Sequence, residues 1–158
     1  MRIKVVASVA ALLFLAGLAV TSSVRAADDP SNGTWKLNLA KSKLATAPKS
    51  MTTTIKVENG TETYTAEGTD ASGKATSGSF TAKLDGTDAP VTGNPYGDTI
   101  SIKHPSPNRF IATVKKDGKV TVTVHVVISA DGKTRTATYS GKTAEGKAVS
   151  DVYVYDKQ

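Results

Sequence analysis

The chain has no cysteine among its 158 residues. It therefore contains no disulfide bond, no thiolate nucleophile and no zinc site built on cysteine. It also lacks the cysteine to which a bacterial lipoprotein attaches its lipid. A single domain of this length buries roughly two thirds of the surface of its unfolded chain, so it folds without such cross-links.

Histidine is almost as scarce, with only His104 and His125 in the whole sequence. The two lie on separate predicted strands, and neither has an acidic or histidine neighbour at the spacing of a metal site. The sequence also has no G-x-S-x-G motif, no glycine-rich phosphate loop and no calcium-loop spacing. A Ser-His-Asp triad can be assembled from distant strands, because it is defined by its geometry, but nothing in the sequence indicates one. We therefore predict no enzymatic activity, no catalytic residue, no metal site and no cofactor.

The first 26 residues have the pattern of a secretory signal peptide. Arg2 and Lys4 form a basic start, an apolar run covers 5–20, and small residues precede Ala26, after which (or after Ala27) we predict cleavage. The apolar run is shorter than the ~20 residues that a membrane span needs, which disfavours an uncleaved anchor helix. We expect a single domain over 27–158 that is periplasmic or secreted, with no membrane span in the mature form.

The charge of the mature chain is small and evenly distributed. Removing the three basic residues of the signal leaves 17 basic and 14 acidic residues, a net charge of +3. The densest basic cluster is Lys115, Lys116 and Lys119, whereas a nucleic-acid surface needs a longer basic stripe. We predict no nucleic-acid partner, and the sequence identifies no protein partner.

Apolar and polar residues alternate along the mature chain, which is the period of half-buried strands. The longest stripe is Val120, Val122, Val124, Val126 and Ile128. Turn signals separate the runs, and four Asn-Gly or Asp-Gly pairs suit tight hairpins with positive φ angles: Asn59-Gly60, Asp85-Gly86, Asp117-Gly118 and Asp131-Gly132. This pattern predicts an all-β, antiparallel up-and-down meander of eight to ten strands. We expect it to close into a barrel, because closure removes exposed strand edges, with an open sandwich as the alternative.

Both ends of the predicted domain resemble a known family. Gly33-Thr34-Trp35 resembles the G-x-W opening of the calycins, the group of lipocalins and fatty-acid-binding proteins, and the ending 154–157, Val-Tyr-Asp-Lys, is similar to that of the fatty-acid-binding branch. The resemblance implies a lipocalin-like barrel that binds a small hydrophobic ligand, with Trp35 plugging its closed end. The chain is more similar still to a set of small secreted bacterial proteins of unassigned function, which share its 34–38 and 41–43 segments and its 90–93 loop, and this likeness implies no activity.

The chain departs from the fatty-acid-binding pattern at its functional positions. The 40–50 segment contains Pro48 and is too short for the two lid helices of that family. The Arg of the family's Arg-x-Tyr is replaced by Tyr153, and its second Arg by the apolar 126–128 segment. The nearest cation is Arg135. Because arginine is seldom buried unpaired, we expect it to face solvent, and if it points inward it must be paired or solvated.

Two functions fit these observations. The first is a carrier of a small apolar ligand, with candidate ligand-binding residues on the inward stripes: Trp35, Leu37, Tyr64, Phe80, Phe110, Val122, Val124, Arg135, Tyr139 and Tyr153. The second is an envelope or interaction scaffold with a filled core, in which the 90–97 loop presents Tyr96 as an exposed aromatic contact.

Overall fold

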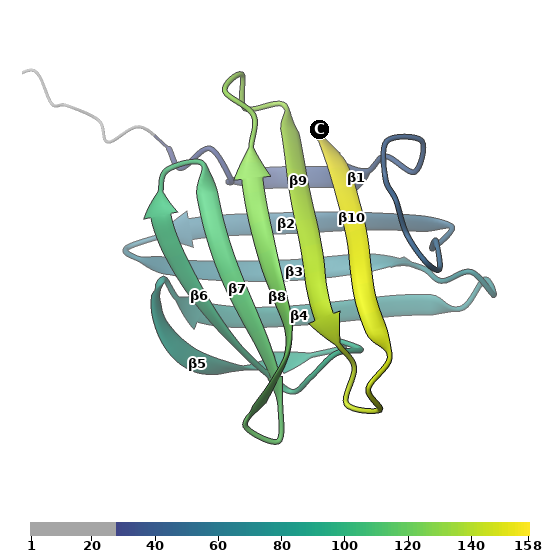
Figure 1. Cartoon of the computed structure of the whole chain (residues 1–158). Helices are drawn as coiled ribbons and strands as arrows, with labels where there is room; N and C mark the ends of the chain where they lie inside the picture. Colours follow the sequence, from purple (N-terminus) through teal and green to yellow (C-terminus); the bar gives the residue numbers. More distant parts are fainter. Residues whose placement is uncertain (1–27) are drawn as a thin grey trace, which may run out of the picture.

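The computed structural model describes residues 28–158 (Figure 1), so the predicted signal peptide lies outside the described residues. No part of 28–158 forms a helix, and hence none of it forms a helix long and apolar enough to cross a membrane. The described chain consists of ten strands: β1 (Gly33–Leu37), β2 (Ser50–Glu58), β3 (Thr61–Thr69), β4 (Ala75–Lys83), β5 (Asp85–Thr92), β6 (Thr99–Ser106), β7 (Arg109–Lys116), β8 (Lys119–Ile128), β9 (Thr134–Lys142) and β10 (Ala148–Lys157).

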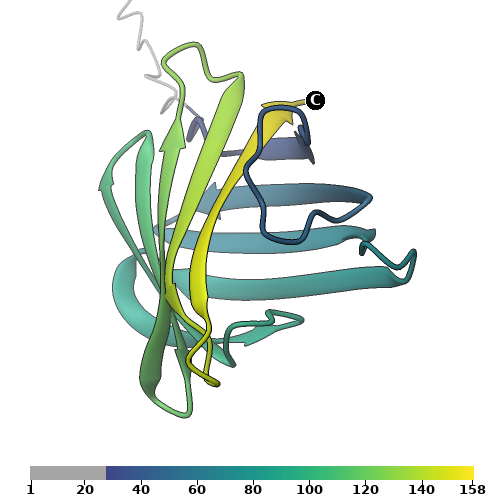
Figure 2. The ribbon, with the colours of Figure 1, turned by 45° about the vertical axis from the view of Figure 1, so that its right-hand side comes forward.

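The strands form a closed antiparallel barrel in which each strand pairs with its neighbours in sequence. Closure is made by the first and last strands, with Trp35 opposite Lys157 and Leu37 opposite Tyr155. β1–β4 cross β6–β10 at a steep angle, and β5 curves from one group to the other (Figures 1 and 2). The predicted meander and its closure are thus confirmed, and the sandwich alternative is not.

Tight turns explain why successive strands return beside one another. Asn59 and Gly60 have φ angles of 51° and 72°, and Asp117 and Gly118 have φ angles of 50° and 75°. Two consecutive positive φ angles define the type I′ turn that matches the twist of a hairpin. The predictions at these two Asn-Gly and Asp-Gly pairs are therefore confirmed.

The prediction of a tight hairpin at Asp85-Gly86 was wrong, because both residues belong to β5. β5 pairs with β4 only near its far end, where Ser79 lies opposite Thr92 and Phe80 opposite Val91. Its pairing with β6 shifts register just after Asp85, so the start of β5 diverges from β4. In the barrel wall, β4 and β5 are therefore joined through these two residue pairs.

The core lies inside the barrel, and Trp35 is its largest fully buried side chain. Its indole Nε1 donates a hydrogen bond of 2.8 Å to the carbonyl oxygen of Ser31, which ties the segment before β1 to the core. The ammonium of Lys157 lies 5.0 Å from the centre of the indole ring, on the strand that closes the barrel.

One strand departs from the predicted alternation. Val120 is 61% exposed, whereas its neighbours Thr121 and Val122 are both buried. The pairing of β7 with β8 shifts by one residue here, so Thr121 is the extra residue of a bulge and reverses the alternation before it. Gly141 on β9 accommodates the bulge, since a Cβ at that position would lie 2.1 Å from the carbonyl oxygen of Thr121. The predicted inward position of Val120 was wrong for this reason.

Candidate ligand-binding cavity

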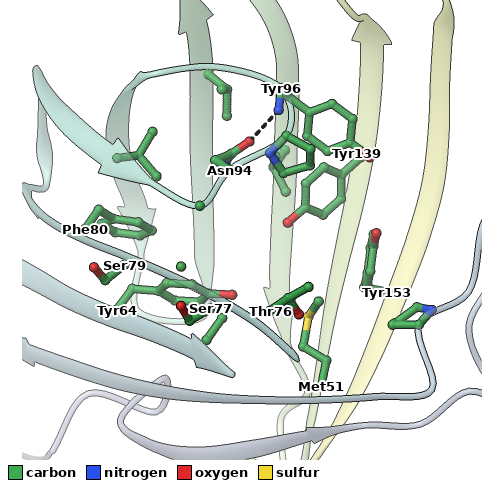
Figure 3. A pocket seen from close by; sticks show the side chains of 18 of the residues that line it. Met51, Tyr64, Thr76, Ser77, Ser79, Phe80, Asn94, Tyr96, Tyr139 and Tyr153 are labelled. Atoms are coloured by element: carbon green, nitrogen blue, oxygen red, sulfur yellow. Dashed lines mark hydrogen bonds between the residues drawn. The ribbon is translucent and has the colours of Figure 1, made fainter. Parts of the chain in front are cut away.

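The interior of the barrel is not completely filled and contains a cavity of about 360 Å³. Tyr64 and Phe80 line one side from β3 and β4, and Tyr139 and Tyr153 line the other from β9 and β10 (Figure 3). A volume of this size falls within the range of about 300–1,000 Å³ that small-molecule sites occupy.

All five tyrosines of the chain line this cavity. The rings of Tyr64 and Phe80 are stacked with their centres 4.9 Å apart, and those of Tyr139 and Tyr153 are 5.0 Å apart. Burial raises the pKa of Tyr64, Tyr139 and Tyr155. Their phenols are therefore neutral at ordinary pH, and each combines an apolar ring with a hydroxyl that can donate or accept a hydrogen bond.

Three connections contribute to one border of the cavity. They are the β1–β2 connection through Thr46 and Pro48, the β3–β4 turn through Asp70 and Ala71, and the β5–β6 loop through its 93–96 segment. Thr46 and Ala71 are exposed, so this border reaches the surface of the protein.

The β5–β6 loop points Tyr96 towards the cavity. The amide of Tyr96 donates a hydrogen bond of 2.9 Å to Oδ1 of Asn94 (Figure 3), and its carbonyl oxygen accepts one of 2.8 Å from the hydroxyl of Thr121. The phenol donates to the buried carboxylate of Asp151 at 3.4 Å. Tyr96 is thus half-buried, and the expectation of an exposed aromatic contact here was wrong, because the bulge residue Thr121 holds the loop against the barrel.

Arg135 lies inside the barrel with only 8% of its surface exposed, so the expectation that it faces solvent was wrong. Its guanidinium carbon lies 5.4 Å from the centre of the Tyr155 ring, in the geometry of a cation–π contact. No carboxylate oxygen within residues 28–158 lies within 4.0 Å of an Arg135 nitrogen.

A second, smaller cavity of about 30 Å³ lies on the other side of Arg135, which lines both. Glu62 lines the small cavity together with Ser31 and Phe110, and it is 5% exposed. Burial raises the pKa of Glu62 to about 7; the charge of Arg135 opposes this rise and that of Asp29 adds to it. The small cavity is therefore lined by a guanidinium and by an acid whose pKa is about 7.

The structure brings most of the predicted ligand-binding residues together. Six of them line the main cavity: Tyr64, Phe80, Val124, Arg135, Tyr139 and Tyr153. Phe110 lines the small cavity, whereas Trp35, Leu37 and Val122 belong to the packed core and line neither.

Sequence reasoning missed Tyr96, Tyr155, Met51 and Glu62, which line one of the two cavities. Strand alternation contains a signal for two of them, since Tyr155 shares a face with Tyr153 and Glu62 shares one with Tyr64. Tyr96 lies in a loop, where no periodicity applies.

Within the described part of the chain, no group of three histidine or acidic side chains is placed to hold a metal ion. No protein-family model matches the sequence, and no curated protein matches it significantly.

Proposed function

We propose that this protein binds a small, mainly apolar ligand inside its barrel and performs no catalysis on it. The observation that carries this proposal is the aromatic cavity of about 360 Å³. Protein interiors are normally packed to the density of organic crystals, and unfilled spaces much larger than a water molecule are few. A cavity of this size is therefore better suited to a ligand than to a scaffold with a filled core.

The lining supports the same function. Apolar and aromatic walls with a few polar groups are typical of sites for small organic ligands, and here the polar groups are phenols and Arg135. The calycin-like ends of the sequence, Gly33-Thr34-Trp35 and the 154–157 segment, agree with a ligand-binding barrel. The signal-peptide pattern of residues 1–26 supports a periplasmic or secreted carrier.

The fluorescent dye N-phenyl-1-naphthylamine, which is neutral and apolar, tests the proposal directly. We expect the dye to bind the protein in one-to-one stoichiometry with increased emission, and native mass spectrometry to detect the complex. Ala66 is half-buried on β3 and lines the cavity, whereas the neighbouring Thr65 is exposed on the outer face. Ala66→Phe should therefore reduce dye binding, and the matched variant Thr65→Phe should not. Absence of binding, or equal binding by the two variants, would overturn the proposal.

A further inference from the structure

The guanidinium of Arg135 is a positive charge inside the barrel that has no direct carboxylate partner. All 14 acidic residues of the chain lie in the described part, from Asp28 onwards, and none contributes an oxygen within 4.0 Å of an Arg135 nitrogen. A buried charge is costly unless it is paired and hydrogen-bonded. An anion at this position would supply the missing partner.

The cavity provides a place for such an anion. Arg135 lines the main cavity, where Tyr64, Tyr139 and Tyr155 surround the same space. The guanidinium carbon lies 5.4 Å from the centre of the Tyr155 ring, and the charge of Arg135 opposes the rise that burial produces in the pKa of all three phenols. Neutral phenols are hydrogen-bond donors, and a guanidinium binds planar anions through paired N–H groups.

We propose that the ligand of the cavity is an organic anion whose charged group binds Arg135 and whose apolar body lies against the tyrosines and Phe80. This inference rests on the proposed function and specifies the chemical class of the ligand.

When it is ionised, the carboxylate of Glu62 competes with an anionic ligand for the guanidinium of Arg135. Glu62 lines the small cavity together with Arg135, and the other groups that interact with it are Asp29, from the segment before β1, and Tyr64, on β3 itself. Its register partners on β2 and β4 carry no charge, and His104 of β6 lies 3.8 Å from the carboxylate of Asp29. A bound anion disfavours ionisation of Glu62, so the anion binds with uptake of a proton.

The expected pH dependence follows from this coupling. Glu62, with a pKa of about 7, is mostly protonated at about pH 6 and mostly ionised at about pH 8. Each unit by which the anion raises that pKa multiplies the ratio of the two limiting affinities by about ten. Anion binding should therefore be stronger at about pH 6 than at about pH 8, whereas binding of a neutral ligand should change little.

Two dyes with the same anilinonaphthalene body separate the contribution of charge from that of apolar contact. 8-Anilinonaphthalene-1-sulfonate carries a sulfonate that stays ionised over this pH range, and N-phenyl-1-naphthylamine carries no charge. A hydrogen-bonded charge is worth about 1.5–3 kcal/mol, which corresponds to an affinity difference of about ten- to a hundredfold. We expect the wild-type protein to prefer the sulfonate dye by about that factor at about pH 6.

Three variants assign the preference to Arg135. The double variant Arg135→Gln with Glu62→Gln keeps the interior neutral and should lose the preference for the sulfonate dye, so that the ratio of its affinities for the two dyes falls to about one. Arg135→Lys should restore part of the preference. Glu62→Gln alone should bind the sulfonate dye more tightly at about pH 8 and remove the pH dependence. Circular dichroism of each variant confirms that it is folded.

The outcomes distinguish this inference from the function on which it rests. Equal affinity of wild type for the two dyes, or a preference that survives in the double variant, would overturn the anion site and leave the ligand-binding function standing. Failure of both dyes to bind would overturn the proposed function and the anion site together.

Discussion

Replacing Glu62 with glutamine is expected to change how the stability of the protein depends on pH. Glu62 is 5% exposed, and burial raises its pKa from an ordinary value of 4.5 to about 7. The folded protein therefore holds this proton more tightly than the unfolded chain does. The resulting stabilisation is fully present below about pH 4.5 and is lost as the pH rises through 7. Between about pH 5 and about pH 8 the loss amounts to about 2.5 kcal/mol of unfolding free energy.

Urea unfolding measures this difference. Trp35 is the only tryptophan and is fully buried, so its emission reports loss of the core. At about pH 5 Glu62→Gln should be more stable than wild type by less than about 1 kcal/mol, because Glu62 is neutral in the folded protein and only begins to ionise in the unfolded chain near pH 4.5. From about pH 5 to about pH 8 this advantage of the variant should grow by about 2.5 kcal/mol, because the variant no longer buries a carboxylate.

Glu58→Gln is the matched control, because the side chain of Glu58 is 62% exposed and pairs with Lys56 at 2.7 Å. A hydrogen bond from Lys56 lowers the pKa of Glu58 below its ordinary value of 4.5. The contribution of Glu58 to stability therefore changes with pH only below the tested pH range. The difference between this variant and wild type should stay constant from about pH 5 to about pH 8. A constant difference for Glu62→Gln as well, or one that grows towards acid, would show that burial does not raise the pKa of Glu62.

Three further substitutions, with Gly118→Ala as a control for one of them, test how the barrel is held together. Trp35→Ala should lower the unfolding free energy by about 3–5 kcal/mol in denaturant titrations followed by circular dichroism, and a loss below about 1 kcal/mol would show that the core does not depend on this residue. Gly93→Ala places a Cβ 1.9 Å from the carbonyl oxygen of Ser77 at a φ of 64°, whereas Gly118→Ala meets open space at a φ of 75°. In thermal unfolding, Gly118→Ala should lower stability by about 1–2 kcal/mol and Gly93→Ala by clearly more. Equal losses would contradict the close approach of Gly93 to Ser77. Asp151→Ala removes the acceptor of a 2.7 Å hydrogen bond from a backbone amide of the β1–β2 connection. It should cost about 1–3 kcal/mol and speed hydrogen exchange at that amide, and unchanged exchange there would argue against the anchor.

The strands and their order follow from local features of the sequence. Alternation of apolar and polar residues indicates strands because successive side chains in a strand point to opposite faces. Turn pairs such as Asn59-Gly60 return the chain beside itself, and successive hairpins leave an antiparallel meander as the simplest arrangement. The same alternation places Tyr64, Phe80, Tyr139 and Tyr153 on inward faces, so four aromatic walls of the cavity could be predicted.

Arg135 shows where two sequence rules conflict. Alternation along β9 places it on the inward face with Ala137 and Tyr139, whereas the cost of burying a charge favours solvent. Arg135 adopts the inward position, where it lies beside the ring of Tyr155 and lines the small cavity together with Glu62. Tyr155 and Glu62 lie 20 or more positions from Arg135 in sequence, so their proximity to it could not be predicted from the pattern of β9 alone.

The all-β class, the meander and most of the inward-facing aromatic residues could be predicted from local sequence, because each depends on neighbours within one strand or one turn. Three features could be seen only once the strands were assembled: the main cavity, the small cavity that Arg135 and Glu62 both line, and the bulge at Thr121 that turns Val120 outward and holds Tyr96 against the barrel. These features depend on how strands distant in sequence approach one another across the barrel. The distance between facing walls sets the volume of the cavity, and the groups that surround Arg135 set the cost of burying its charge.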